Sequence, residues 1–226
     1  MSSIELFQNK TDCCGCSACY NVCPRKAISM QEDEYGYVYP VIDQDKCVGC
    51  GLCRKVCHYQ ADKELRTPIK AYAAAGKKEE FLKKAASGGM FSLVADKILE
   101  EGGVVFGAAM EYHNNTLIPK HIAVESKEEL FKLQGSKYVQ SFIGNTYAEA
   151  KKYLADGRKV LFSGTPCQIE GLKGYLGREY ENLYTIDIIC HGVPNAKWFQ
   201  DYIKVFETKL QGSIYSYNFR DKSRGQ

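Results

Sequence analysis

The later part of the chain alternates between short apolar runs and amphipathic stretches, a pattern typical of alternating strands and helices. The apolar runs predict strands at residues 69–76, 103–112, 117–124, 159–164, 183–190 and 213–220. Helical spacing of apolar positions predicts helices at residues 77–86, 90–102, 145–157, 168–176 and 196–210. The sequence HNNT (residues 113–116) is typical of a hairpin turn between the second and third strands. This order of elements favours an α/β domain with a mixed sheet.

The first sixty residues lack that pattern and are dominated by cysteine. The spacing CxxCxxCxxxC occurs twice, and the two copies hold eight of the eleven cysteines: Cys13, Cys16, Cys19 and Cys23, then Cys47, Cys50, Cys53 and Cys57. The N-terminal sequence MSSIELFQNK has no apolar segment typical of a signal peptide. We therefore expect a cytoplasmic protein, whose thiols meet a reducing environment in which such clusters usually bind metal.

Disulfides, zinc and iron–sulfur clusters are the three interpretations of these cysteines. Structural zinc sites usually pair two short knuckles across a longer gap. Four cysteines in an eleven-residue run, the first run followed by proline, instead match the spacing of bacterial ferredoxins. The spacing therefore favours two [4Fe-4S] clusters over zinc or disulfides.

The ligands of the two clusters are expected to cross between the runs. In two-cluster ferredoxins the fourth cysteine of each run binds the cluster of the other run. Cluster one is therefore assigned to Cys13, Cys16, Cys19 and Cys57. Cluster two is assigned to Cys47, Cys50, Cys53 and Cys23. This exchange of ligands would join the two cysteine runs, each of low stability alone, into one unit.

Two residues depart from the ferredoxin pattern. His58 follows Cys57 where proline is expected, and it is either a solvated side chain at a loop exit or a group that tunes the cluster. Cys14 is surplus to the ligand spacing, and it is either a packed spare thiol or a redox sensor.

Composition and charge give no support to nucleic-acid binding or to a membrane-spanning segment. The net charge is only +3, with acidic and basic residues mixed, so nothing indicates nucleic-acid binding. No apolar run reaches eighteen residues, so no transmembrane segment is expected. A polar, proline-containing stretch at residues 58–70 separates the two parts. The expected domains are residues 1–62, of the two-cluster ferredoxin type, and residues 63–226, of the α/β type.

Three places in the α/β part carry residues suited to a cofactor. Ser87, Gly88 and Gly89 precede a predicted helix, where they either approach a phosphate or form an N-cap and turn. A loop rich in hydrogen-bond donors is either a cofactor contact or an ordinary surface loop. Its polar and aromatic side chains are Gln134, Ser136, Lys137 and Tyr138.

The third place lies where a predicted strand ends and a helix begins, a position where α/β sheets tend to bind ligands. Its residues are Gly164, Thr165, Pro166 and Cys167. A helix N-terminus favours the thiolate of Cys167, so a thiol hydrolase is conceivable. No local motif, however, ties any of the candidate bases His113, His121 and His191 to this thiol.

Taken in order, the double cysteine run, SGGMFSLVADKILEEGGVVFGA, LQGSKYVQS, SGTPCQIEGL and IDIICHGVP resemble the coenzyme F420 hydrogenase/dehydrogenase beta-subunit family. The resemblance covers nearly the whole chain. It implies a ferredoxin module fused to a flavin-binding domain. It also implies FAD or FMN near Ser87, Gly88, Gly89, Gln134, Ser136, Lys137 and Tyr138.

By the same resemblance, Gly164, Thr165, Pro166 and the candidate catalytic residue Cys167 line the redox side of the flavin. Cys190 and His191 match the CHG turn of the family, where Cys190 either serves a further cluster or is a buried thiol. Members of the family typically continue beyond the point where this sequence stops, so a truncated chain is expected.

The resemblance implies an iron–sulfur flavoprotein oxidoreductase. Its redox partner would be a ferredoxin or a hydrogenase or dehydrogenase subunit, and its acceptor a deazaflavin, another small molecule or a protein. The alternative is an electron-carrier module whose α/β part only docks a partner, because fold analogy does not establish activity.

Overall fold

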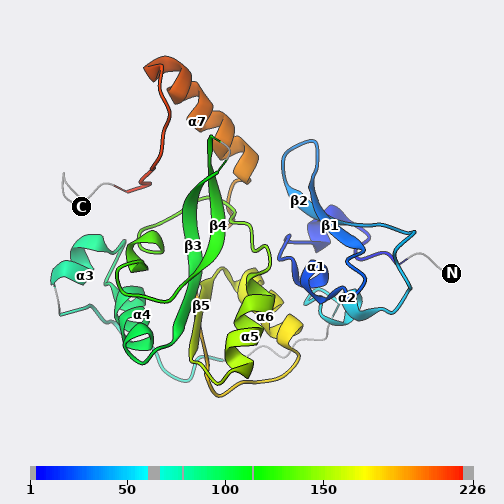
Figure 1. Ribbon diagram of the computed structural model, residues 1–226, viewed down its shortest axis with the longest axis horizontal. Coiled ribbons are helices and arrows are strands. Elements are labelled where there is room, and N and C mark those ends of the chain that lie inside the picture. Colours follow the sequence, from blue (N-terminus) through cyan, green and yellow to red (C-terminus); the bar gives the residue numbers. More distant parts are fainter. Residues whose placement is uncertain (1–3, 61–66, 78, 114, 221–226) are drawn as a thin grey trace.

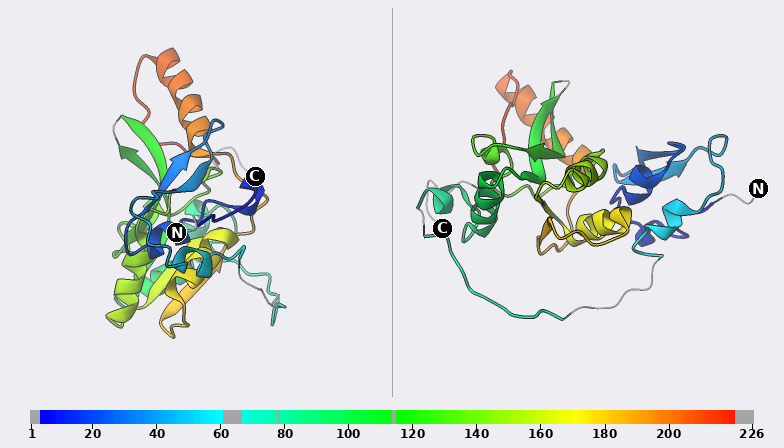
Figure 2. Two further views of the ribbon diagram at one scale, coloured as in Figure 1. Left: turned by 90° about the vertical axis from the view of Figure 1, so that its right-hand side faces the viewer. Right: turned by 60° about the horizontal axis from the view of Figure 1, so that its bottom comes forward.

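The computed structural model describes residues 4–60, 67–77, 79–113 and 115–220. An N-terminal module (residues 4–60) lies beside an α/β domain (residues 79–220), as Figure 1 shows. The expected division between residues 62 and 63 lies outside the described residues and stays a prediction. Residues 67–77 run along the outside of the molecule as far as the first helix of the α/β domain (Figure 2).

The N-terminal module consists of a hairpin and short helical turns. Strands β1 (Ile28–Glu32) and β2 (Val38–Ile42) pair antiparallel. The turns are η1 (Lys10–Asp12), α1 (Ala18–Val22) and α2 (Leu52–Lys55). The small core of the module includes Leu6, Ile28 and Cys53. So little apolar contact is typical of a module that depends on bound metal for stability.

The α/β domain is built on one mixed sheet with the strand order β4-β3-β5-β6. Strands β3 (Val104–His113) and β4 (Thr116–Val124) form the predicted hairpin, although residue 114 of its turn lies outside the described residues. Strands β5 (Val160–Gly164) and β6 (Leu183–Asp187) continue the sheet in parallel with β3. The predicted mixed sheet is confirmed.

Helices cover both faces of this sheet. Helix α4 (Met90–Glu100) packs on one face against Val105 and Leu161. Helices α5 (Thr146–Ala155) and α6 (Pro166–Leu176) pack on the other face, where Phe106 and Phe162 stack with ring centroids 5.4 Å apart. Because successive strand residues point to opposite faces, the continuous apolar runs of β3 and β5 serve both cores.

The remaining helices lie at the edges of the domain. They are α3 (Glu79–Lys84), the short turn η2 (Leu130–Lys132) and α7 (Ala196–Leu210). Helix α7 packs beside the β3–β4 hairpin through Phe199 and Ile203, which share a cluster with Leu117 and Val139.

Two predicted strands do not form. Residues 69–76 contain no strand, and Ile69 and Tyr72 are 97% and 80% exposed. Residues 213–220 also contain no strand, although Tyr217 and Phe219 pack against the α7 cluster. Among the described residues, no strand pairs with either segment, and apolar alternation alone supplies no partner for the backbone hydrogen bonds. Strand β6 is also shorter and more exposed than the buried run predicted, with Ile189 88% exposed.

Two glycines of α6 allow this helix to lie directly against the N-terminal module. A Cβ on Gly174 would lie 2.5 Å from the carbonyl oxygen of Val56. A Cβ on Gly171 would lie 3.1 Å from the Sγ of Cys16. Helix α6 therefore joins the cysteine-rich module to the sheet, since its other side packs on β5.

Asn195 links the hairpin of the N-terminal module to α7. Its side chain accepts a hydrogen bond from the backbone amide of Trp198 at 2.7 Å and donates one to the Tyr35 carbonyl at 2.8 Å. We expect Asn195→Ala to lower the free energy of unfolding by about 1 kcal/mol, because the N-cap of α7 is lost. Urea unfolding measures this. Asn195→Asp keeps the cap acceptor and should lose less; equal losses would contradict the capping role.

Candidate metal centre and the adjoining thiols

The structure brings the eight run cysteines together as two groups of four. Cys23 lines one pocket with Cys47, Cys50 and Cys53. The second pocket is lined by Cys13, Cys16, Cys19 and Cys57, and also by the surplus Cys14 and by His58. Each group takes three cysteines from one run and the fourth from the other run, which is the crossed grouping that the sequence predicts. Ligation itself stays a prediction.

The two runs adopt matching backbone conformations around these pockets. Gly15 and Gly49 occupy the same place in each run, with φ angles of 65° and 69°. Two residues later, Ser17 and Gly51 are also left-handed, with φ angles of 64° and 75°, and each precedes a short helix. Such tight turns favour glycine because they need positive φ. They let three cysteines of one run face a common pocket.

The donor set fits an iron–sulfur cluster. Burial raises the pKa of Cys13 to about 11 and holds the pKa of Cys19 above its usual value. Buried thiols of this kind become thiolates only when a cation offsets the loss of solvation. Soft thiolate donors, four to a site, favour iron–sulfur clusters. The residues present therefore suit two such clusters.

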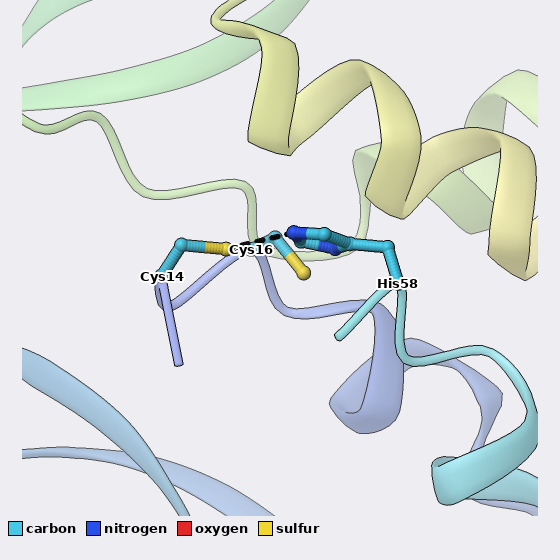
Figure 3. A group of neighbouring side chains, drawn as sticks. All are labelled: Cys14, Cys16 and His58. Carbon is cyan, nitrogen blue, oxygen red and sulfur yellow. Dashed lines mark hydrogen bonds between the residues drawn. The ribbon is translucent and has the colours of Figure 1, made fainter. Parts of the chain in front are cut away.

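His58 is not the solvated side chain that the simpler interpretation predicts. It is half-buried, and its Nε2 lies 3.7 Å from the Sγ of Cys14 (Figure 3). Its Nδ1 is buried and has no hydrogen-bond partner among the described residues. Cys14, Cys16 and His58 place their ligating atoms within 4.8 Å of one another. The interpretation as a solvated histidine is therefore wrong, because the 58–60 turn folds back onto the cysteine loop.

Cys167 of the α/β domain belongs to the same neighbourhood. It is the second residue of α6, which Thr165 and Gln168 cap reciprocally, and the Oγ1 of Thr165 lies 3.1 Å from its Sγ. A hydrogen bond from the thiol of Cys14 lowers the pKa of Cys167 to about 6. Hydrogen bonds to Cys16 and then to Cys167 hold the pKa of Cys14 above its usual value. The surplus thiol of the first run and the candidate catalytic thiol thus influence each other's pKa.

Helix α4 connects two of the three segments predicted to bind flavin, residues 87–89 and residues 134–138. Gly89 is left-handed at the start of that helix, and the carbonyl of Gly88 accepts a bond from Gly76 at 2.7 Å. Gln134 donates to the hydroxyl of Ser92 at 3.0 Å. Ser87 is exposed and Ser136 half-buried. The structure therefore places the start of α4 near the 134–138 loop.

Lys137 has protein partners in this loop. Its ammonium donates to the carbonyls of Gln134 at 2.7 Å and Lys132 at 3.1 Å, so it closes the end of η2. Burial lowers its pKa to about 8. Tyr138 is 45% exposed, and its ring meets Phe219 edge-on. These contacts account for the conformation of the loop without a bound ligand. The role of its residues in binding flavin stays a prediction.

His121 lies between that loop and the end of β5. Its Nδ1 lies 2.9 Å from the Ser141 hydroxyl, and its Nε2 lies 3.0 Å from the Ser163 carbonyl. Burial lowers the pKa of His121 to about 4. Gly164 follows at the strand end, where a Cβ would lie 3.5 Å from this ring, and Pro166 opens α6. His121 is thus a packed, hydrogen-bonded side chain.

Cys190 and His191 lie apart from these groups in an exposed turn. The sulfur of Cys190 accepts a bond from the amide of Gly192 at 3.4 Å. The expectation that Cys190 could be a buried thiol is wrong, because the chain after β6 leaves the sheet and its side chains face solvent.

Sequence reasoning missed the contact between Cys14 and His58, and the influence of Cys167 on the pKa of Cys14. The departures at positions 14 and 58 were the available signal, since both break the ferredoxin pattern and the structure places them side by side. Nothing local in the sequence indicates that Cys167 joins them.

Among the described residues, no helix combines the length and apolar character needed to span a bilayer.

Comparison with known families agrees with both parts of the chain. A 4Fe-4S dicluster domain matches residues 12–61. The N-terminal region of the coenzyme F420 hydrogenase/dehydrogenase beta subunit matches residues 71–145. The C-terminal region of the same subunit matches residues 157–226.

Individual relatives are more distant. The coenzyme F420-dependent sulfite reductase of Methanocaldococcus jannaschii is 24% identical over 80% of this chain and 28% of its own length. The uncharacterized protein MJ1349 of the same organism is 25% identical over 76% of this chain and 54% of its own length. The chain therefore spans about half, or less, of these two relatives.

A solved structure, the F420-reducing [NiFe] hydrogenase complex of Methanosarcina barkeri, is similar over 67% of this chain and 56% of the compared chain. Its identity is 22% and its TM-score 0.48. The two regional matches, in order behind a dicluster domain, give the assignment: this chain belongs to the coenzyme F420 hydrogenase/dehydrogenase beta-subunit family and carries a 4Fe-4S dicluster domain.

Proposed function

We propose that this chain is an iron–sulfur flavoprotein oxidoreductase, or a subunit of one. It passes electrons between two [4Fe-4S] clusters and a flavin, and onward to a deazaflavin or another acceptor. The observation that carries the proposal is the direct seating of α6, which bears Cys167, on the cysteine loop of the first run. That contact supports electron transfer from the N-terminal module into the α/β domain.

The two cysteine groups take different roles in this proposal. Cys16 of the first group faces α6, as the close approach to Gly171 indicates, so cluster one lies on the inner side. Cys50 of the second group is exposed, and Val48 and Leu52 beside it are 54% and 38% exposed. A small exposed apolar surface beside a redox centre suits a transient protein partner. We therefore assign the partner, a ferredoxin or a hydrogenase or dehydrogenase subunit, to cluster two.

The α/β domain supplies the flavin site in this proposal. Gly88, Gly89, Gln134 and Lys137 would hold FAD or FMN near the start of α4, and Thr165 and Cys167 would line its reactive side. When bound, the clusters supply one-electron transfer and the flavin supplies two-electron chemistry. The protein positions the groups and excludes water. The deazaflavin acceptor rests on the similarity to the coenzyme F420-dependent sulfite reductase. The cytoplasm, where thiols stay reduced, is the compartment we propose.

Anaerobic purification with iron, sulfide and flavin measured against protein tests this function. We expect about eight irons, about eight sulfides and about one flavin per chain, because two cubanes and one cofactor require them. The same iron without flavin, even after reconstitution with FAD and with FMN, would favour an electron carrier with a docking domain. Zinc in place of iron would contradict both functions.

A further inference from the structure

A set of buried hydrogen bonds encloses the turn between β5 and α6. The Nδ1 of His121 lies 2.9 Å from the Ser141 hydroxyl, and its Nε2 lies 3.0 Å from the Ser163 carbonyl. The Nε2 of Gln168 lies 3.2 Å from the same hydroxyl, and its Oε1 accepts from the Thr165 amide at 3.0 Å. The contacts begin at Ser163 and end at Thr165, so with the backbone between these residues they form a hydrogen-bond ring.

The direction of each bond in this ring follows from its partners. A carbonyl oxygen can only accept, so the Nε2 of His121 carries the proton and donates to Ser163. The Nδ1 of His121 is then unprotonated and accepts from the Ser141 hydroxyl. That hydroxyl oxygen accepts in turn from the Nε2 of Gln168, whose Oε1 is taken by Thr165. Every donor of the ring therefore meets an acceptor when His121 is neutral.

The hydrogen-bond ring joins four segments of the α/β domain. His121 belongs to β4, Ser163 to β5 and Gln168 to α6, whereas Ser141 lies in the segment before α5. All four residues are buried. The backbone holds Ser141 beside His121, because the His121 amide donates to the Phe142 carbonyl at 2.8 Å. The ring thus ties the β5–α6 turn to two segments that are distant in the sequence.

Packing alone does not require a histidine at position 121. Its imidazole stacks on Phe162 with ring centroids 5.4 Å apart, a contact that phenylalanine makes without the cost of burying polar nitrogens. A fully satisfied buried network instead fixes one arrangement of the groups that it connects. Gly164 lies inside the hydrogen-bond ring, where a Cβ would lie 3.0 Å from the Oε1 of Gln168. The polar atoms of His121 therefore act on this turn.

The turn leads to the two side chains assigned above to the reactive side of the flavin. Thr165 caps α6, and its Oγ1 lies 3.1 Å from the Sγ of Cys167. The amide of Thr165 is held by Gln168. The side chain of Gln168 is oriented by Ser141, which His121 orients in turn. A path of hydrogen bonds thus connects His121 to the start of α6.

We propose that His121 is a positioning residue. Through Ser141 and Gln168 it holds the β5–α6 turn, and with it Thr165 and Cys167, in the arrangement that faces the flavin. The flavin part rests on the proposed function, whereas the fixed turn does not. Both nitrogens of His121 are engaged in the hydrogen-bond ring, so this residue is not available as a general base.

Two variants break the hydrogen-bond ring and keep the packing around it. His121→Phe retains an aromatic ring to stack on Phe162, and Ser141→Ala removes one hydroxyl. Ser213→Ala, at an exposed serine, is the control. In the iron-loaded full chain, hydrogen exchange at the Thr165 amide should become about tenfold faster in both variants and stay unchanged in the control. Mass spectrometry with residue resolution measures it, and urea unfolding checks that each variant is folded.

Titration with FAD and with FMN separates positioning from a purely structural role. The dissociation constant of the bound flavin should rise about tenfold in His121→Phe and in Ser141→Ala, because the groups that face it are no longer held. The double variant should lose no more than either single variant, since both changes break the same hydrogen-bond ring. Independent roles would instead give losses that multiply.

The tautomer of His121 is a test that needs no variant. The chain has four histidines, so nitrogen-15 labelling of histidine gives a simple NMR spectrum. At neutral pH, His121 of the unmodified chain should carry its proton on Nε2, with Nδ1 unprotonated. A proton on Nδ1 would leave the Ser163 carbonyl without this donor and would overturn the inference.

Two further results would overturn it. They are unchanged exchange at the Thr165 amide in the folded variants, and flavin binding that is unchanged or is lost independently in the two variants. An unmodified chain that binds neither FAD nor FMN would contradict the proposed function instead. Exchange at Thr165 and the tautomer of His121 then still decide whether His121 holds the turn, because neither measurement involves flavin.

Discussion

Replacing Cys23 and Cys47 together by alanine should leave about four irons per chain, whereas replacing Cys23 and Cys13 together should leave almost none. Cys23 and Cys47 line one pocket, so their loss removes a single cluster. Cys13 lines the other pocket, so the second pair removes one ligand from each cluster. The two double variants are matched, since each removes two sulfurs.

Iron and sulfide per chain, measured after anaerobic reconstitution, give the result. Cys190→Ala removes an exposed thiol of neither group and should keep about eight irons. Far-ultraviolet circular dichroism checks that the α/β domain remains folded, because loss of a cluster also removes folding energy from the module. If ligation followed the runs without crossing, the two double variants would exchange their iron contents.

Gly174→Ala should lower the free energy of unfolding by about 2 kcal/mol and loosen the N-terminal module from α6. Two effects oppose each other. Alanine is a better helix former than glycine by about 1 kcal/mol. The new Cβ, however, would lie 2.5 Å from the Val56 carbonyl oxygen, a backbone atom that cannot rotate away. Overpacking of this kind costs up to about 3 kcal/mol, so the steric cost prevails.

Urea unfolding measures the loss, and hydrogen exchange at the amides of residues 56–60 reports the loosened contact. Gly212→Ala is the matched control. Its Cβ would meet nothing closer than 3.8 Å, so it should be neutral or slightly stabilising. A stabilised Gly174→Ala variant with unchanged exchange would show that α6 does not rest on the module as described.

The two variant series address different links of the proposed electron path. The cysteine pairs decide how the clusters are held, and the glycine variant decides whether the inner cluster is held against the α/β domain. Loss of flavin reduction in Gly174→Ala with all iron retained would connect the contact to electron transfer. Because Gly174 contacts Val56 rather than a cysteine, the variant leaves every proposed ligand in place.

Elements and chemistry that depend only on nearby residues could be predicted from the amino-acid sequence. Cysteine spacing within each run and the period of α4 are local properties, and the sequence predicted both. The alternation of strands and helices likewise predicted the mixed sheet, because each apolar run needs a covering layer.

Which segments pair with one another depends on the packing of the whole fold. Residues 69–76 and 213–220 have the composition of strands, but no strand in the described part of the chain pairs with their backbone. Cys14 and His58 come from separate segments, and they meet because the 58–60 turn folds back onto the cysteine loop. The glycines of α6 bring that helix against Cys16 and Val56. Contacts between distant segments depend on how whole layers pack, and a single sequence carries no local signal of that packing.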